Sequence, residues 1–185
     1  MKRTHRVALG ACLAMLALTG TSAASASASE FVFSKTGTLK GTALSAQKFN
    51  SSGGKWECSK ETISGSATVS KTTIQKITVQ YEGCVYFGVL LKAAAAEFEL
   101  NTSGSLTLLK KFTMSSSLCT IGFQPGTYLT LNYANKPAGK IEIAAEVNKI
   151  TTYGSGSLCS YSENSNGTLV GTSLLELEGG TAEVK

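Results

Sequence analysis

The sequence predicts an all-β protein: an antiparallel β-sandwich of roughly nine or ten strands, stapled by disulfide bonds. Short segments alternate apolar and polar residues with a period of two, and clusters of Gly, Ser, Thr and Asn separate them. These connections are too short for the helical crossovers that a parallel sheet requires. Four cysteines follow an N-terminal export signal, and an even number in an exported chain indicates disulfide bonds.

Residues 1–28 contain, in sequence, the three regions of a secretory signal peptide. A basic start, MKRTHR, precedes an apolar run over residues 7–18 and the small-residue stretch TSAASASAS. We expect cleavage after Ala28 or, as the next choice, after Ala26. The apolar run is too short to cross a bilayer, and no later stretch is long and apolar enough to form a transmembrane segment. The protein is therefore expected to be secreted, extracellular or part of the cell envelope.

Residues 29–185 are expected to form a single domain, because no linker or low-complexity segment divides them. This part of the chain contains no His, Arg or Asp. The missing residue types exclude a Ser-His-Asp or Cys-His relay, a histidine zinc site, an Asp-rich calcium loop and bidentate arginine recognition of phosphate. Loss of Lys2, Arg3 and Arg6 with the signal lowers the formal net charge from +5 to +2. We expect no cofactor, no metal and no nucleic-acid partner.

The strands begin with the stretch FVFSKTGTLKGTAL, which opens the expected mature chain. Four later segments each place their apolar residues on one face, which is expected to point into the core. These sets are Ile77, Val79 and Tyr81; Leu129, Leu131 and Tyr133; Ile141, Ile143, Ala145 and Val147; and Leu175 with Leu177. The first of these strands is expected to end in a turn at Gly83.

The stretch VLLKAAAAEFEL is ambiguous. Alanine favours helix, whereas Glu97-Phe98-Glu99-Leu100 alternates as a strand does. We predict strand here, and a short helix over residues 92–96 is the alternative.

Cys84 lies beside a carboxylate and three aromatic residues in the stretch ITVQYEGCVYFG. A reactive cysteine needs a histidine, a cation or a helix N-terminus nearby, and Cys84 has Glu82 instead. Disulfide pairing is therefore expected. Order along the chain favours Cys58–Cys84 and Cys119–Cys159, although four cysteines allow three pairings. Each bridge would stabilise the fold by roughly 3 to 4 kcal/mol through the loop it closes.

Aromatic side chains are the candidate ligand-binding residues. Tyr86 and Phe87 end the ITVQYEGCVYFG stretch, and Tyr128 falls on the expected polar face of its strand. Trp56 directly precedes Glu57-Cys58 and is expected to pack on the disulfide. Burial in the core is the alternative for all of these side chains.

Two glutamate pairs, Glu97 with Glu99 and Glu176 with Glu178, have i, i+2 spacing, so each pair shares one strand face. Hydrolysis of a glycosidic bond uses two carboxyl groups about 5 to 9.5 Å apart. Both pairs lie opposite apolar residues, which is typical of solvated surface. A glutamate-dependent hydrolase of extracellular carbohydrate is therefore an alternative to the expected function.

Five stretches follow one another along residues 29–185: FNSSGGKWECS, ITVQYEGCVYFG, LCTIGFQPGTYLTLNYAN, IEIAAEVNKITTYGSGSLCS and NGTLVGT. In this order, and with the Tyr-x-Gly-Cys stretch, the chain resembles an uncharacterised group of small exported bacterial β-rich hypothetical proteins. The resemblance covers nearly all of the expected mature chain and implies an all-β secreted domain. It implies no activity, ligand or catalytic residue.

The expected function is that of a non-enzymatic surface or binding module that contacts an envelope glycan or another protein. The missing catalytic side chains, the Ser- and Thr-rich strand faces and the export signal favour it. The alternatives are the glutamate-dependent hydrolase and a carrier that holds a small apolar molecule between two sheets.

Overall fold

The computed structural model describes residues 29–185, and the expected signal peptide with its cleavage site lies outside the described residues. Within them the chain forms sixteen β-strands and no helix, which confirms the predicted all-β class. In chain order the strands are β1 (Phe31–Phe33), β2 (Gly37–Ala43), β3 (Gln47–Ser51), β4 (Gly54–Ala67), β5 (Lys71–Thr72), β6 (Ile74–Tyr86), β7 (Val89–Ala93), β8 (Ala96–Asn101), β9 (Ser105–Leu108), β10 (Phe112–Ser115), β11 (Thr120–Phe123), β12 (Gly126–Leu129), β13 (Leu131–Lys136), β14 (Lys140–Ser155), β15 (Tyr161–Leu177) and β16 (Ala182–Val184).

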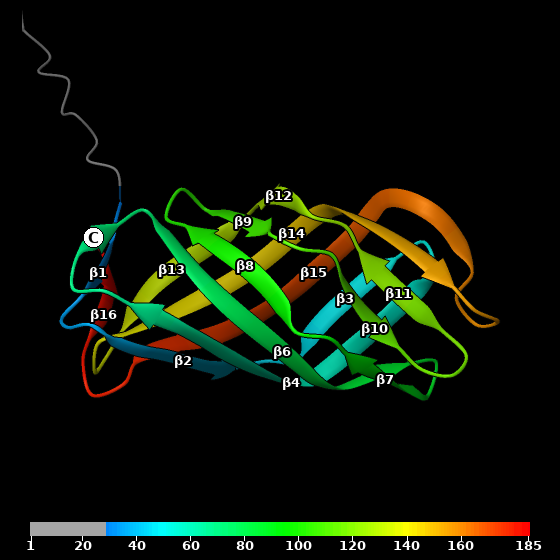
Figure 1. Cartoon of the computed structure of the whole chain (residues 1–185), viewed down its shortest axis with the longest axis horizontal. Helices are drawn as coiled ribbons and strands as arrows, with labels where there is room; N and C mark the ends of the chain where they lie inside the picture. Colours follow the sequence, from blue (N-terminus) through cyan, green and yellow to red (C-terminus); the bar gives the residue numbers. More distant parts are fainter. Residues whose placement is uncertain (1–28) are drawn as a thin grey trace, which may run out of the picture.

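Thirteen strands pair in one large antiparallel sheet, and β16, β1 and β5 form a second sheet of three strands. The pairs of the large sheet lead from β6 through β4, β2, β15, β14, β11, β10 and β7 back to β6. The sheet therefore curves until it meets itself. Its strands lie in two facing layers around one apolar core, as predicted for a sandwich-like fold (Figure 1).

The structure has more strands than predicted because the chain interrupts several of them. β2 and β3 together occupy the position of one strand between β4 and β15, with a break at residues 44–46. β12 and β13 are separated at Thr130, whose φ is 100°. A period-two pattern does not reveal such breaks, because alternation resumes on both sides of them.

The small sheet covers one end of the sandwich (Figure 1). Phe31 and Phe33 of β1 are buried, and the Phe31 ring meets the Tyr133 ring edge-on, with 5.4 Å between the centroids. The first and last described strands therefore close the core at this end.

Three of the four predicted inward faces are confirmed. Their residues are buried or packed against the buried core: Ile77, Val79 and Tyr81; Ile141, Ile143, Ala145 and Val147; Leu175 and Leu177. The fourth face is partly wrong, because the positive φ of Thr130 reverses the alternation. Leu129 is 70% exposed, whereas its neighbour Tyr128 is buried and Leu131 returns to the core.

Both disulfide bonds form as predicted, Cys58 with Cys84 and Cys119 with Cys159. Cys58 and Cys84 lie directly opposite each other on β4 and β6, with 3.8 Å between their Cα atoms. All four cysteines are buried. The Cys58–Cys84 bridge therefore links two strands that are already hydrogen-bonded to each other, near the end of β6 that leads into the β6–β7 hairpin.

β6 does not turn at Gly83, contrary to the prediction, and runs on to Tyr86. Gly83 has a φ of 59°, and the inward face changes there from Tyr81 to Cys84 and Tyr86. Only the residue after Tyr86, Phe87, begins the turn. The glycine therefore shifts the alternation by one residue inside a continuous strand.

Residues 92–96 are strand and connection, so the strand prediction is confirmed and the helical alternative is wrong. β7 ends at Ala93 and β8 begins at Ala96. The amide of Ala94 donates to the carbonyl of Thr113 at 2.8 Å, which gives the short connection a partner outside its own segment.

Candidate functional site

The break between β2 and β3 shapes both the interior and the outer surface of the sheet. Residues 44–46 leave the strand ladder, and the amides of Leu44 and Ser45 both donate to the carbonyl of Thr172 on β15, at 2.8 and 3.2 Å. Gln47, the first residue of β3, is fully buried. Gly171 faces its amide and has no room for a Cβ atom.

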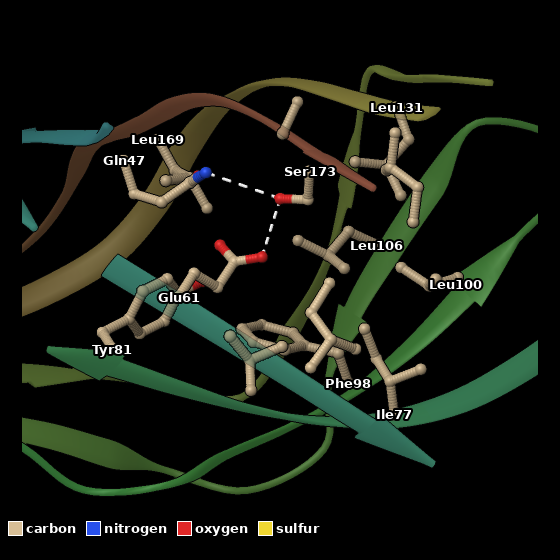
Figure 2. A pocket seen from close by; sticks show the side chains of 14 residues that line it. Gln47, Glu61, Ile77, Tyr81, Phe98, Leu100, Leu106, Leu131, Leu169 and Ser173 are labelled. Atoms are coloured by element: carbon tan, nitrogen blue, oxygen red, sulfur yellow. Dashed lines mark hydrogen bonds between the residues drawn. The ribbon is translucent and has the colours of Figure 1, made fainter. Parts of the chain in front are cut away.

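Three polar side chains fill the interior side of this break (Figure 2). Ser173 donates to a carboxylate oxygen of Glu61 at 2.7 Å, and Gln47 Nε2 lies 3.4 Å from Ser173 Oγ. Gln47 also donates to the carbonyls of Ser45 and Thr172, at 3.3 and 3.4 Å. Gln47 thus adds a donor to two backbone carbonyls at the break, of which the Thr172 carbonyl also accepts the amides of Leu44 and Ser45, so the first role of the cluster is structural.

The interior cavity beside this cluster is small. It has a volume of about 40 Å³, and apolar residues such as Ile77, Phe98 and Leu131 line most of it (Figure 2). Burial raises the pKa of Glu61 to about 6, and the hydrogen bond from Ser173 partly opposes this rise. The space suits one or two water molecules and not an apolar ligand of metabolite size.

Glu61 also lacks a second carboxyl group within the cavity, since no other glutamate lines it. The four glutamates of the surface pairs contact lysines instead, as expected for solvated surface. These contacts are Glu97–Lys110, Glu99–Lys76, Glu176–Lys140 and Glu178–Lys40.

The outer side of the break carries a groove. One hollow of about 590 Å³ is lined by Lys48, Phe49, Asn50, Lys55, Trp56, Glu57, Val85, Thr168 and Val170. A second hollow of about 330 Å³ lies over the break itself, among Ala46, Gly171 and Thr172. Both hollows include Lys48, Glu57 and Val170, so they form one continuous surface across β4, β3 and β15.

The hairpin between β6 and β7 adjoins this groove through Val85, which lines the larger hollow. Tyr86 pairs with Val89, so the loop contains only Phe87 and Gly88. Both have a positive φ, 48° and 79°, as a type I′ turn requires. Asn, Asp and Gly are the usual residues at the first of these positions, and a phenylalanine there is strained.

The hairpin carries three exposed apolar side chains, and two of them, Val85 and Leu90, are cross-strand neighbours. Phe87 is 71% exposed, Leu90 is 69% exposed, and Val85 lies directly opposite Leu90 in the strand register. The buried Cys58–Cys84 bridge lies one residue pair below Val85. The hairpin therefore presents an apolar patch on a covalently fixed base.

The structure separates the predicted binding aromatics. Tyr86 is fully buried, and its hydroxyl donates to the carbonyl of Gly53. Tyr128 is also buried, and its hydroxyl donates to the carbonyl of Gln124 at 2.9 Å. The prediction of exposed rings is wrong for these two residues, and Phe87 alone of the three offers its ring to solvent.

Trp56 is buried, and its ring stacks on Phe49 with 5.4 Å between the centroids. Its indole nitrogen lies 3.3 Å from the sulfur of Met114. The only tryptophan of the chain is therefore a core residue beneath the groove and has no free face.

The charged residues of the groove have no ion-pair partner among residues 29–185. Seven Lys–Glu pairs occur in the described residues, and none includes Lys48, Lys55 or Glu57. Sequence reasoning missed these residues, because the groove joins positions from four strands that are up to about 120 residues apart. Their individual patterns look like ordinary solvated strand faces.

No protein-family model, curated protein or solved structure matches this chain. Residues 29–185 contain no helix long and apolar enough to cross a membrane. The same residues hold no group of three or more acidic or cysteine side chains arranged for a metal ion.

Proposed function

We propose that this protein is an exported, non-enzymatic binding module that acts outside the cytoplasmic membrane. Its binding surface is the outer groove across β4, β3 and β15, together with the patch of Val85, Phe87 and Leu90 on the β6–β7 hairpin. The partner is another protein or an envelope glycan.

The conformation of Phe87 carries the proposal. A non-glycine residue in the left-handed region costs on the order of 1 to 2 kcal/mol, and asparagine would avoid most of this cost. The ring is also largely exposed, so it contributes little burial in return. Strained and exposed apolar residues are typical of binding surfaces, and Phe87 lies two residues from Val85, which lines the larger hollow.

The groove supports the proposal independently. An outer surface with an apolar rim, a hollow of about 590 Å³ and unpaired charges offers a partner both burial and directional contacts. The interior offers neither, since its cavity has about 40 Å³ and one carboxyl group. This contrast favours a binding module over the carrier and the hydrolase.

A binding experiment tests the proposal. The exported protein is incubated with a glycan array and with immobilised envelope fractions, and amide hydrogen exchange is compared before and after binding. We expect saturable retention, with slower exchange at Lys48, Val85 and Val170. Retention without protection of these residues, or no retention on any material together with no self-association, would contradict the proposal.

A further inference from the structure

We propose that the partner of the groove is a second copy of this chain, packed face to face about a twofold axis. The inference rests on the proposed function in one respect, that the groove is a binding surface. It adds the identity of the protein that binds there.

The strand register places one row of outward-facing residues straight across six strands. From β7 through β6, β4, β3 and β15 to β14, the row is Leu90, Val85, Glu57, Lys48, Val170 and Glu146. All six side chains are exposed. A partner that lies across the groove must contact the middle of this row, because Val85, Glu57, Lys48 and Val170 line the larger hollow.

The four middle residues of the row are complementary to the same four residues taken in the opposite order. Val85, Glu57, Lys48 and Val170 give the order apolar, acidic, basic, apolar. A twofold axis that runs along the strands, between β4 and β3, reverses this order in the second copy. Lys48 then faces the partner's Glu57, and Val85 faces the partner's Val170.

The charges are available for such contacts. Lys48 and Glu57 are cross-strand neighbours, yet neither forms an ion pair with any residue of the described part of the chain. On the neighbouring sheet surface, Lys140 and Glu176 are also directly opposite each other and do form one. The Lys48 and Glu57 side chains therefore keep their charges free for a partner.

The adjacent row explains the position of Phe87. In the adjacent row, Lys55 of β4 pairs with Asn50, which pairs with Thr168, and Phe87 follows Tyr86, the last residue of β6 that pairs with β4. The same axis brings this end of β6, and Phe87 after it, toward the partner's Thr168, which lines the hollow of about 590 Å³. The projecting ring of each copy thus meets the hollow of the other, and Lys55 faces the partner's Asn50.

Symmetric contacts of this kind use one surface twice, which is the commonest arrangement in homo-oligomers. Two sheet faces pack about 10 Å apart with their strands nearly aligned, as the axis requires. Leu90 and Glu146 oppose each other at the two ends of the row. These two ends lie at the rim of the dimer interface. An apolar side chain can face a charged one there, because the side chains at the rim stay in contact with water.

Charge reversal tests the inference by sedimentation velocity on the exported protein. Over a range of protein concentrations that extends to about 100 µM, we expect the wild-type protein to form a dimer. Lys48→Glu alone and Glu57→Lys alone should each weaken the dimer by at least about tenfold, because like charges meet across the axis. Lys35→Glu, at another exposed lysine without an ion pair, should leave the dimer unchanged.

The mixture of the two single variants gives the sharpest test. A copy with Lys48→Glu and a copy with Glu57→Lys restore both opposite-charge contacts between them, so the mixture should dimerise although each variant alone is monomeric. Circular dichroism checks that each variant is folded. A charge contact within one chain cannot produce this rescue, because each variant keeps its own like-charged pair.

A monomeric wild type, or a mixture that stays monomeric, overturns the inference. If the monomer then binds an envelope glycan or another protein through the groove, the proposed function stands and the second copy is excluded. If the monomer binds no envelope material either, both fail. A dimer that persists in both single variants places its interface elsewhere and also overturns the inference.

Discussion

Tyr86 and Phe87 are neighbours in sequence and their rings touch, with 4.6 Å between the centroids, but they face opposite environments. Tyr86 is fully buried and Phe87 is 71% exposed. The division between core and surface therefore runs through a single peptide bond at the end of β6. This relationship places a rigid core directly beneath the candidate binding patch.

Replacing Phe87 with asparagine is expected to stabilise the isolated protein. Asparagine adopts a positive φ readily and favours the type I′ turn, so the free energy of unfolding should rise by about 0.5 to 1 kcal/mol. Urea denaturation measures the change. Leu129→Asn is a matched control, since Leu129 is 70% exposed on β12 and lies outside the hairpin. A loss of stability in the Phe87 variant would show that the ring contributes to folding.

Glu61→Gln should remove a pH dependence of stability. Burial raises the pKa of Glu61 from 4.5 to about 6, so the folded state holds the proton more tightly than the unfolded chain. The contribution of the protonated carboxyl is therefore complete below about pH 4.5 and is lost as pH rises through 6. By linkage, the loss amounts to about 2 kcal/mol.

The measurement is the difference in unfolding free energy between the Glu61→Gln variant and wild type at pH 4.5 and pH 8. Tyr81 lies opposite Glu61 in the strand register. Burial and, to a smaller extent, the charge of Glu61 raise the pKa of Tyr81 well above its usual value. The Tyr81 hydroxyl therefore stays neutral over this pH range. The variant should gain stability relative to wild type at the higher pH. A difference that is constant with pH would contradict the assigned environment of the carboxyl.

Gly171→Ala should destabilise the fold, because the added methyl group would overlap the buried amide of Gln47. We expect a loss of about 1 to 3 kcal/mol by thermal or urea unfolding. Gln47→Ala should also cost stability, since it removes the amide donor to the Ser45 carbonyl and one of three donors to the Thr172 carbonyl. The double variant should lose less than the two single losses together, and simple additivity would argue against this contact.

Replacing both Cys58 and Cys84 with alanine should lower the free energy of unfolding by about 2 to 4 kcal/mol. Non-reducing peptide mapping of the native protein should recover the Cys58–Cys84 and Cys119–Cys159 peptides as linked pairs. Free thiols in the exported protein, or a different pairing, would contradict the structure at the base of the hairpin.

Sequence reasoning reached the fold class, the disulfide pairing and most inward faces, because each depends on local alternation or on chain order. It failed where a single backbone angle reverses the alternation, at Thr130 and at Gly83. For this reason Tyr128, which was predicted to lie on the polar face of its strand, is buried in the core. The polar cluster of Gln47, Glu61 and Ser173 was also hidden, because three separate strands bring it together.

The candidate site was less accessible to sequence reasoning than the fold. Phe87 was a candidate from its place near Cys84, but its exposure depends on a turn that begins at Phe87 and not at Gly83 as expected. Lys48, Glu57 and Val170 gave no signal, since only the register of β3, β4 and β15 aligns them. Alternation predicts which residues face outward, and pairing decides which of these residues meet.

The most direct test of the binding surface compares wild type, Phe87→Asn and Leu129→Asn for retention on envelope fractions and for self-association. If the groove and its hairpin bind the partner, Phe87→Asn should weaken binding at least about tenfold while the protein remains folded and at least as stable. Leu129→Asn should bind as wild type does. Equal binding by all three proteins would contradict the assignment of the binding surface to the hairpin and groove.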